Sequence, residues 1–258
     1  MNRRQAVRDT ASRLQTLYRS GGVREVARGI RDYAHCNGLL PLEWVLTTKT
    51  LQLDDVAITF TVDGSESVSR ARGHGELPVL EDMRETLRDD DVLWDIGANM
   101  GSYALLGALV GANVVAFEPG ARARSLLVDN AARNGVSDAI DATPYALSDY
   151  DGEGVLRPAS RPGIRELADD GVGDTVPVRR GDSVSVPAPD VIKIDVEGVE
   201  LAVLDGLGDR LSDSRVCYVE VHDEAEEPLV RERLARAGLS VTDSFDEILR
   251  AESAGRDD

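Results

Sequence analysis

Cysteine and long apolar runs are scarce in this sequence. Its two cysteines, Cys36 and Cys217, are spaced neither as a disulfide framework nor as a zinc site. No apolar run approaches the roughly 18–20 residues that a membrane-spanning helix needs, and the charged N-terminus lacks the apolar centre of a signal peptide. We therefore expect a cytoplasmic protein without a membrane span.

Lysine and aromatic residues are also rare. Lysine occurs only as Lys49 and Lys193, aromatic residues make up 4% of the chain, and 47 acidic residues outnumber 29 basic ones, for a formal net charge of −18. Concentrated salt favours such a composition, because carboxylates hold hydrated cations while the salt screens their repulsion. The charge predicts a halophilic source and argues against nucleic acid as a partner. Repeated buried-strand patterns argue against disorder, which such a charge can also produce.

The 258 residues suit one large domain with an added terminal segment. Residues 1–50 contain nine basic and four acidic side chains and apolar residues at helical spacing, which predicts basic amphipathic helices. These helices either contact an anionic membrane surface or acidic partner, or pack as a cap on the main domain. Residues 51–72 alternate with a period of two, which predicts a β-hairpin with its turn at Asp63–Gly64. We assign residues 1–75 to an N-terminal extension.

The main domain is organised around Val92–Gly101, with the sequence VLWDIGANMG. This segment predicts a buried strand, a glycine turn and then a helix over 102–110, an arrangement that lets the backbone approach a nucleotide-like ligand. The next strand, Val114–Pro119, ends at Glu118, whose carboxylate can accept hydrogen bonds from ribose hydroxyls. Together, the glycine turn and Glu118 favour an adenosine-containing cofactor. Asp95, just before the turn, can hold an ammonium group or fix the loop.

The remaining pattern alternates strands and helices, as in a doubly wound α/β fold. A segment rich in Gly, Pro and Asp, 151–189, predicts an insertion with short strands that folds over the site on the substrate side. The other expected strands are 139–143, 190–196, 215–222, 239–243 and 247–251, and the other expected helices are 121–133, 198–207 and 228–237, the first closed by a left-handed cap at Asn134–Gly135.

Ionisable residues gather where two neighbouring strands end. Lys193, Asp195 and Glu197 alternate onto one face of the expected strand 190–196, and Glu220 and His222 share a face of the next one. Because open α/β sheets bind ligands at the carboxyl ends of their strands, these residues are candidates for an active site.

Six motifs occur in sequence order, and together they resemble the FkbM family of S-adenosylmethionine-dependent methyltransferases over roughly residues 76–238. They are Asp95–Gly101, Ala116–Pro119, Asn130 with Asn134–Gly135, Ala146–Ser148, Lys193–Gly198 and Glu220–His222. The resemblance implies a Rossmann-like class I methyltransferase domain over 76–251, followed by a loose acidic tail at 252–258. It implies a seven-stranded sheet of order 3-2-1-4-5-7-6, with strand seven antiparallel. It also implies methylation of a hydroxyl oxygen on a sugar, glycolipid or secondary metabolite.

The resemblance also assigns residues to the cofactor, S-adenosylmethionine. Asp95 and the glycine turn are expected to hold its methionine end, Glu118 its ribose, and the segment from Ala146 its adenine. The expected cofactor-binding residues are Asp95, Gly97, Ala98, Asn99, Gly101, Glu118, Pro119, Ala146, Leu147 and Ser148.

Methyl transfer to a hydroxyl needs a group that removes the acceptor's proton. His222 is the expected base, with Glu220 orienting it, while Asp195 and Glu197 bind the acceptor or a cation. The spacing of these residues does not lead us to assign a metal site.

Other classes of protein share part of the pattern. An NAD-dependent oxidoreductase would have a similar strand, turn and acid. However, the G-x-G-x-x-G spacing of that class is missing here, and NAD binding does not explain the Lys193–Gly198 motif. A nucleic-acid methyltransferase would more often carry an Asn/Asp-Pro-Pro-Tyr/Phe run where this chain has Asp195–Glu197. A cofactor-binding module without catalysis is the remaining alternative.

The acidic composition predicts that folding depends on salt. Unscreened carboxylate repulsion opposes compaction, so the protein should be more stable in ~2 M than in ~0.05 M KCl. Thermal unfolding followed by circular dichroism measures this difference, and equal stability in the two solutions would contradict the halophilic interpretation.

Overall fold

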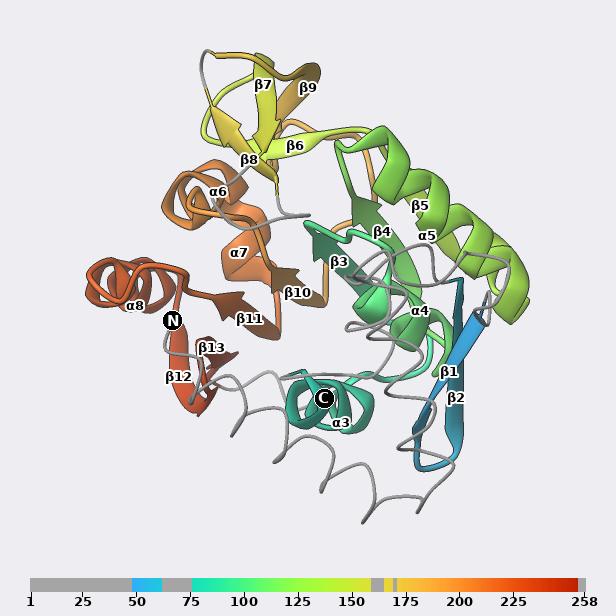
Figure 1. Cartoon of the computed structure of the whole chain (residues 1–258). Helices are drawn as coiled ribbons and strands as arrows, with labels where there is room; N and C mark the ends of the chain where they lie inside the picture. The colour runs from blue at the N-terminus through green and yellow to red at the C-terminus, as the bar shows by residue number, and fades with distance from the viewer. Residues whose placement is uncertain (1–47, 62–75, 159–164, 169–170, 255–258) are drawn as a thin grey trace, which may run out of the picture.

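The computed structural model describes residues 48–61, 76–158, 165–168 and 171–254. Its centre is a seven-stranded sheet with helices on both faces (Figure 1). The strands follow the order β12-β13-β11-β10-β3-β4-β5, in which β13 runs antiparallel to β11. Numbered along the chain within this sheet, the order is 3-2-1-4-5-7-6 with strand seven antiparallel, so the predicted topology is confirmed.

The helices are α3 (Leu77–Thr86), α4 (Ser102–Leu109), α5 (Ala121–Asn134), the 3-10 helix η2 (Ser137–Ala139), α6 (Glu200–Leu207), α7 (Asp209–Asp213) and α8 (Glu227–Arg236). The strands are β1 (Thr48–Leu53), β2 (Val56–Thr61), β3 (Val92–Ile96), β4 (Asn113–Phe117), β5 (Ile140–Thr143), β6 (Ala146–Ser148), β7 (Gly152–Pro158), β8 (Arg165–Ala168), β9 (Asp174–Arg180), β10 (Val191–Ile194), β11 (Val216–Glu220), β12 (Leu239–Phe245) and β13 (Ile248–Ser253).

The sheet has an apolar core on each face. Along β10, Val191 packs with α3, α4, α5 and the β1–β2 hairpin, whereas Ile192 and Ile194 pack with α6, α7 and α8. All three side chains are fully buried, as expected for a central parallel strand covered on both sides. Both faces of the sheet are therefore covered along these strands, and their carboxyl ends are the expected place for a ligand.

The N-terminal hairpin has a turn that the sequence analysis did not predict. It lies at Asp54–Asp55, between β1 and β2, whereas the turn predicted at Asp63–Gly64 falls outside the described residues. Asp54 adopts a left-handed backbone with a φ of 46°, which a short polar side chain tolerates. The predicted alternation is confirmed, since Ile58 and Phe60 are both fully buried. The basic helices expected within residues 1–50 fall almost entirely outside the described residues.

Two asparagines of α5 fix this hairpin to the main domain. The side chain of Asn134 accepts a hydrogen bond from the Thr59 amide and donates one to the Thr59 carbonyl, each 2.8 Å long. Asn130 accepts from the Thr61 amide at 2.7 Å and donates to the Met100 carbonyl at 3.0 Å. Asn130 therefore connects β2 directly to the glycine turn. The helix ends at Gly135 with a φ of 73°, which confirms the expected left-handed cap.

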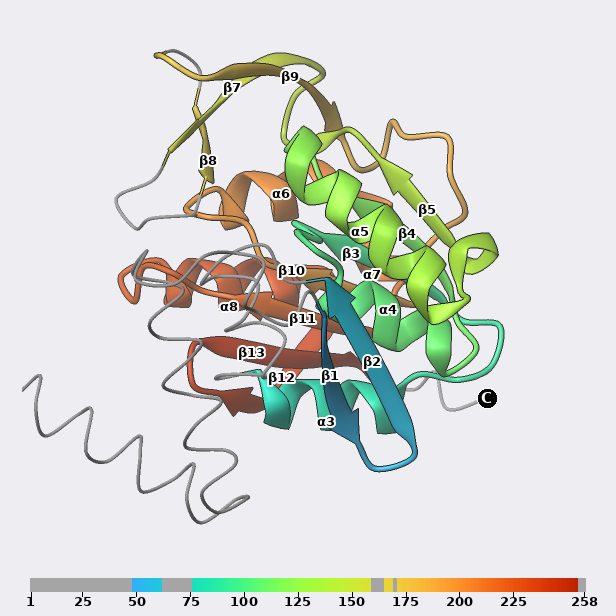
Figure 2. The same cartoon turned by 45° about the vertical axis from the view of Figure 1, so that its right-hand side comes forward.

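The insertion contains more regular structure than the few short strands that the sequence predicted. Strands β6, β9, β7 and β8 form a separate four-stranded sheet, which stands beyond the ends of β3 and β4 and next to α6 (Figure 2). Its small core consists of Ala146, Leu156, Val176 and Val178. The insertion therefore contributes β7, β8 and β9 to a small sheet that β6 completes and that has its own core.

No helix within the described residues is long and apolar enough to cross a membrane.

Replacing Asn134 by alanine should destabilise the protein by about 1–3 kcal/mol, because the two backbone groups of Thr59 lose their partner. Urea unfolding at fixed salt measures the change in the free energy of unfolding. Asn113→Ala, at an exposed position, is the matched control and should change it by less than about 0.5 kcal/mol. Equal effects of the two substitutions would show that the hydrogen bonds between Asn134 and Thr59 do not contribute to the free energy of unfolding.

Candidate active site

The glycine turn is shaped by close contact with the end of β10. Gly97 has a φ of 85°, and a Cβ atom placed there would lie 1.9 Å from the backbone oxygen of Asp195. Only glycine fits this approach. Asn99 and Gly101 also have positive φ values, of 48° and 94°, so the turn folds back on itself before α4 begins. The turn and the loop after β10 therefore lie directly against each other.

Glu118 joins the turn to the end of β4. One carboxylate oxygen accepts a hydrogen bond from the Asn99 amide at 2.8 Å, and the other accepts one from the Gly120 amide at 2.7 Å. A carboxylate oxygen can accept more than one hydrogen bond, including one from a hydroxyl. The position thus fits a ribose-binding acid, and the same carboxylate fixes the conformation of the turn.

Asp95 is buried beneath the turn. One of its carboxylate oxygens accepts a hydrogen bond from the Ala104 amide, in the first turn of α4, at 2.9 Å. Burial raises the pKa of Asp95 and the charge of Lys193 lowers it, while Asp195 and Glu118 raise it further, to about 7. A carboxyl group held in this state can receive a cationic group and ionise against it.

Lys193 does not face the site's surface, as the strand alternation suggested, but lies fully buried below it. Its ammonium group donates to the Ile194 carbonyl at 3.1 Å and lies 3.5 Å from a carboxylate oxygen of Glu220. It also lies 4.9 Å from the ring centre of Tyr103. The buried cation therefore supports Glu220 from beneath.

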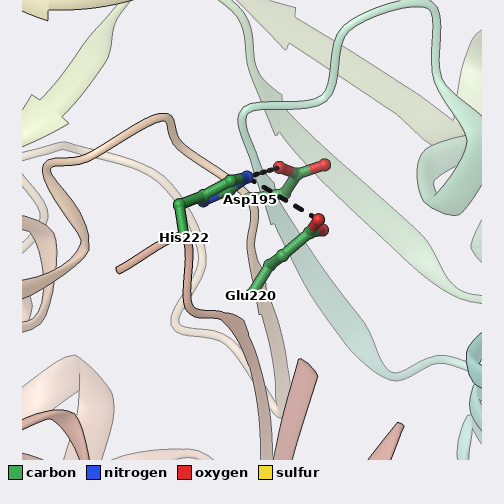
Figure 3. A group of neighbouring side chains, drawn as sticks. All are labelled: Asp195, Glu220 and His222. Carbon is green, nitrogen blue, oxygen red and sulfur yellow. Dashed lines mark ion pairs between the residues drawn. The ribbon is translucent and has the colours of Figure 1, made fainter. Parts of the chain in front are cut away.

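The four residues predicted to take part in catalysis come together around the imidazole of His222, and Figure 3 shows three of them, Asp195, Glu220 and His222. Nε2 of His222 lies 3.9 Å from Asp195, 3.5 Å from Glu197 and 3.6 Å from Glu220. Strand β10 ends at Ile194 and β11 ends with Glu220, so Asp195 and His222 lie in the loops that follow and not in the strands predicted for them, and Glu197 lies in the same loop as Asp195.

Glu200, which the sequence analysis did not select, holds the other side of the ring. Its carboxylate lies 2.6 Å from Nδ1 of His222, while the expected orienting residue, Glu220, faces Nε2. The first turn of α6 brings Glu200 there, and the residue is almost fully buried. Its position two residues after the Lys193–Gly198 motif is the signal that could have identified it.

The electrostatics of the cluster favour a charged imidazole. Burial lowers the pKa of His222, but the hydrogen bond with Glu200 and the charges of Glu197, Glu220 and Asp195 raise it to a net value of about 9. Near neutral pH His222 therefore carries a proton on both nitrogens. It can take up the acceptor's proton only after its own Nε2 proton has been removed.

The residues expected beside an adenine lie in the small sheet. Ala146, Leu147 and Ser148 form β6 and are all buried, with Leu147 in the core under α6. The residues just before β6, Thr143–Tyr145, line a cavity of about 440 Å³. Arg179, 5.4 Å from the ring centre of Tyr145, also lines it.

Comparison with known proteins identifies a family and a sequence relative. Residues 95–254 match the family described as the methyltransferase FkbM domain. The chain is 32% identical over 225 residues to hexuronic acid methyltransferase AglP of Haloferax volcanii, an alignment that covers 84% of this chain and 90% of that protein.

Solved structures resemble the chain more distantly. The methyltransferase FkbM from Methylobacillus flagellatus is 20% identical with a TM-score of 0.49, over 65% of this chain and 45% of that one, so this chain spans less than half of that protein. TYW2 from M. jannaschii, in complex with AdoMet, is 14% identical with a TM-score of 0.44, over 80% and 83% of the two chains.

The buried Asp95 should make stability depend on pH. Its pKa is about 7 in the folded protein, against an ordinary value of 3.8, so the contribution of its protonated form to stability is lost as pH rises from about 4 through 7. The free energy of unfolding of the wild type, minus that of Asp95→Asn, should therefore fall over this range, by at most about 4 kcal/mol. Urea unfolding at constant salt measures the difference. The exposed Asp141→Asn is the control for loss of charge, and a difference that stays constant with pH would contradict the buried, protonated carboxyl.

Proposed function

This chain belongs to the FkbM family of methyltransferases, and we propose that it transfers a methyl group to an oxygen atom of a hexuronic acid or a closely related sugar acid. The family match covers residues 95–254, well over half of the chain. The protein is thus an enzyme whose cofactor is S-adenosylmethionine, and an NAD-dependent oxidoreductase is not favoured. The substrate class comes from the relative named as a hexuronic acid methyltransferase.

One observation carries the proposal: the cofactor turn and the acid–imidazole cluster are in contact. Gly97 of the turn lies against the backbone of Asp195, and Asp195 belongs to the cluster around His222. A methyl donor held at the turn and an acceptor held at the cluster are therefore neighbours, as a direct transfer requires.

We assign the cofactor to the carboxylates on either side of the turn. Asp95 and Glu118 suit a ligand with an ammonium group and ribose hydroxyls, and three positive-φ positions shape the backbone between them. When bound, S-adenosylmethionine supplies a methyl group already activated by its sulfonium. Pro119 and the segment Ala146–Ser148 are proposed to flank its adenine.

The acceptor is assigned to the cluster. Carboxylates of Asp195, Glu197 and Glu220 can accept hydrogen bonds from sugar hydroxyls, and Nε2 of His222 points among them. A hydroxyl acceptor must lose a proton to this cluster, whereas a sugar carboxylate needs no base. Both kinds of oxygen occur in a hexuronic acid, and the methylated product distinguishes them.

A glycolipid acceptor is compatible with the basic helices expected in residues 1–50, which could bring the enzyme to an anionic surface. Most of that segment lies outside the described residues, and its role, like the cytoplasmic location, stays a prediction.

The proposed substrate class can be tested with purified protein, S-adenosylmethionine and paired glycosides that differ only at C6, one a uronic acid and the other its neutral hexose. Mass spectrometry should show methylation of the uronic acid and little of the hexose. Mild base then separates a stable ether, formed at a hydroxyl, from a labile ester, formed at the carboxylate. Preference for the neutral sugar, or methylation of neither, would contradict the proposal.

Two substitutions should separate cofactor binding from catalysis. Glu118→Ala should weaken S-adenosylmethionine binding by about 1–3 kcal/mol, since hydrogen bonds to a charged group are lost. His222→Ala should leave that affinity nearly unchanged and lower turnover by roughly 10²–10⁴. Calorimetry and initial rates measure the two effects, with the exposed Glu153→Ala as control. Full turnover in His222→Ala would remove this residue from the catalytic cluster.

A further inference from the structure

The acid–imidazole cluster has the dimensions of a metal site. Asp195, Glu220 and His222 each offer one ligand atom, and these atoms all lie within 4.8 Å of one another. Figure 3 shows the three side chains converging from the ends of two neighbouring strands. Nε2 of His222 lies 3.9 Å from Asp195 and 3.6 Å from Glu220. A cation about 2.0–2.5 Å from each ligand atom fits between them after a shift of a few tenths of an ångström.

The outer contacts of these residues also match a metal site. Nδ1 of His222 is held by the buried carboxylate of Glu200 at 2.6 Å, which leaves Nε2 directed at Asp195 and Glu220. A carboxylate on the far nitrogen of a histidine is the usual second contact of a metal-binding imidazole. Glu220 is fixed in the same way, since its other oxygen lies 3.5 Å from the buried ammonium of Lys193.

Tyr103 provides an independent observation. It is 4% exposed, and its hydroxyl has no hydrogen-bond partner among the described residues. Its ring centre lies 4.9 Å from the ammonium of Lys193, and burial together with the charges of Glu76, Asp195, Glu220 and Asp95 raises the pKa of its hydroxyl, so Tyr103 lies beside this cluster. A buried hydroxyl without a partner is costly. A water molecule in the coordination shell of a cation would supply the missing partner.

The proposed substrate adds a chemical reason. A hexuronic acid carries a carboxylate, which the acidic residues of the cluster would repel at close range. A cation between them removes this repulsion and can hold two sugar oxygens at once.

We propose that Asp195, Glu220 and His222 bind a divalent cation that holds the sugar-acid acceptor beside the methyl donor. This step rests on the proposed function, and it assigns a metal site where the spacing of the residues in the sequence had led to none. Two carboxylates with one imidazole, and positions left for water and substrate, suit Mg²⁺ or Mn²⁺. The bound cation displaces the Nε2 proton of His222 to solvent, and we assign Glu197, 3.5 Å from that nitrogen, to take up the proton released by a hydroxyl acceptor.

Binding of Mn²⁺ to the full-length, metal-stripped protein tests the site without any assay of activity. The electron paramagnetic resonance signal of free Mn²⁺ should decrease on titration and indicate one site. Glu220→Gln and Asp195→Asn should weaken this binding at least about tenfold. Glu224→Gln, an exposed residue two positions after His222, is the matched control and should bind like the wild type. Circular dichroism verifies that each variant is folded.

Absence of a Mn²⁺ site in the wild type, or equal binding by Glu220→Gln and the wild type, would overturn the proposal. Undiminished methyl transfer after removal of all divalent cations would overturn the cation's role in holding the acceptor. Mn²⁺ binding that depends on Glu220, with no methylation of any uronic acid, would support the cation site and contradict the proposed substrate.

Discussion

The contact between Gly97 and the backbone of Asp195 is the constraint on which the site depends. It brings the turn after β3 and the loop after β10 so close together that a Cβ atom at Gly97 would lie 1.9 Å from a carbonyl oxygen. The donor and acceptor sides of the proposed reaction meet through this contact. Because neighbouring parallel strands end at the same edge of the sheet, a pair of loops at that edge is enough to build both sides.

Buried charges hold the two sides in place. Lys193 lies fully buried beneath the site, where it supports Glu220 and acts on Asp95, and Glu200 fixes the ring of His222. Buried ionisable groups are costly unless paired, so their presence at one edge of the sheet indicates a binding or catalytic role and not general stabilisation. The hairpin contributes from a distance, since Asn130 connects β2 to the carbonyl of Met100 in the turn.

Much of the architecture could be predicted from the sequence, because local pattern and motif order determine it. The alternation at Ile58 and Phe60 and the left-handed cap at Gly135 are local signals, and the strand order followed from the family resemblance. The turn at Asp54–Asp55 was missed because Asp63–Gly64 is the stronger turn sequence. The small sheet was underestimated because its strands are stabilised by pairing with one another, which no local pattern reports.

The sequence predicted which ionisable residues lie together, but not how they are arranged. Strand alternation correctly grouped Asp195, Glu197, Glu220 and His222, yet it could not tell that Tyr103 of α4 covers the face on which Lys193 lies. Glu200 and Tyr103 reach the cluster only through the packing of α6 and α4 on the sheet. Such contacts depend on tertiary structure and leave little trace in a single sequence.

The central claim is that the cofactor turn and the acid–imidazole cluster form one site, and the nuclear magnetic resonance of bound S-adenosylmethionine carrying a ¹³C-labelled methyl group tests it most directly. With Mn²⁺ bound at the cluster, the paramagnetic ion should strongly broaden the methyl signal, and Glu220→Gln should restore the sharp line at the same Mn²⁺ concentration. A methyl signal that stays sharp while both cofactor and Mn²⁺ are bound would show that the two lie apart, and would contradict this account.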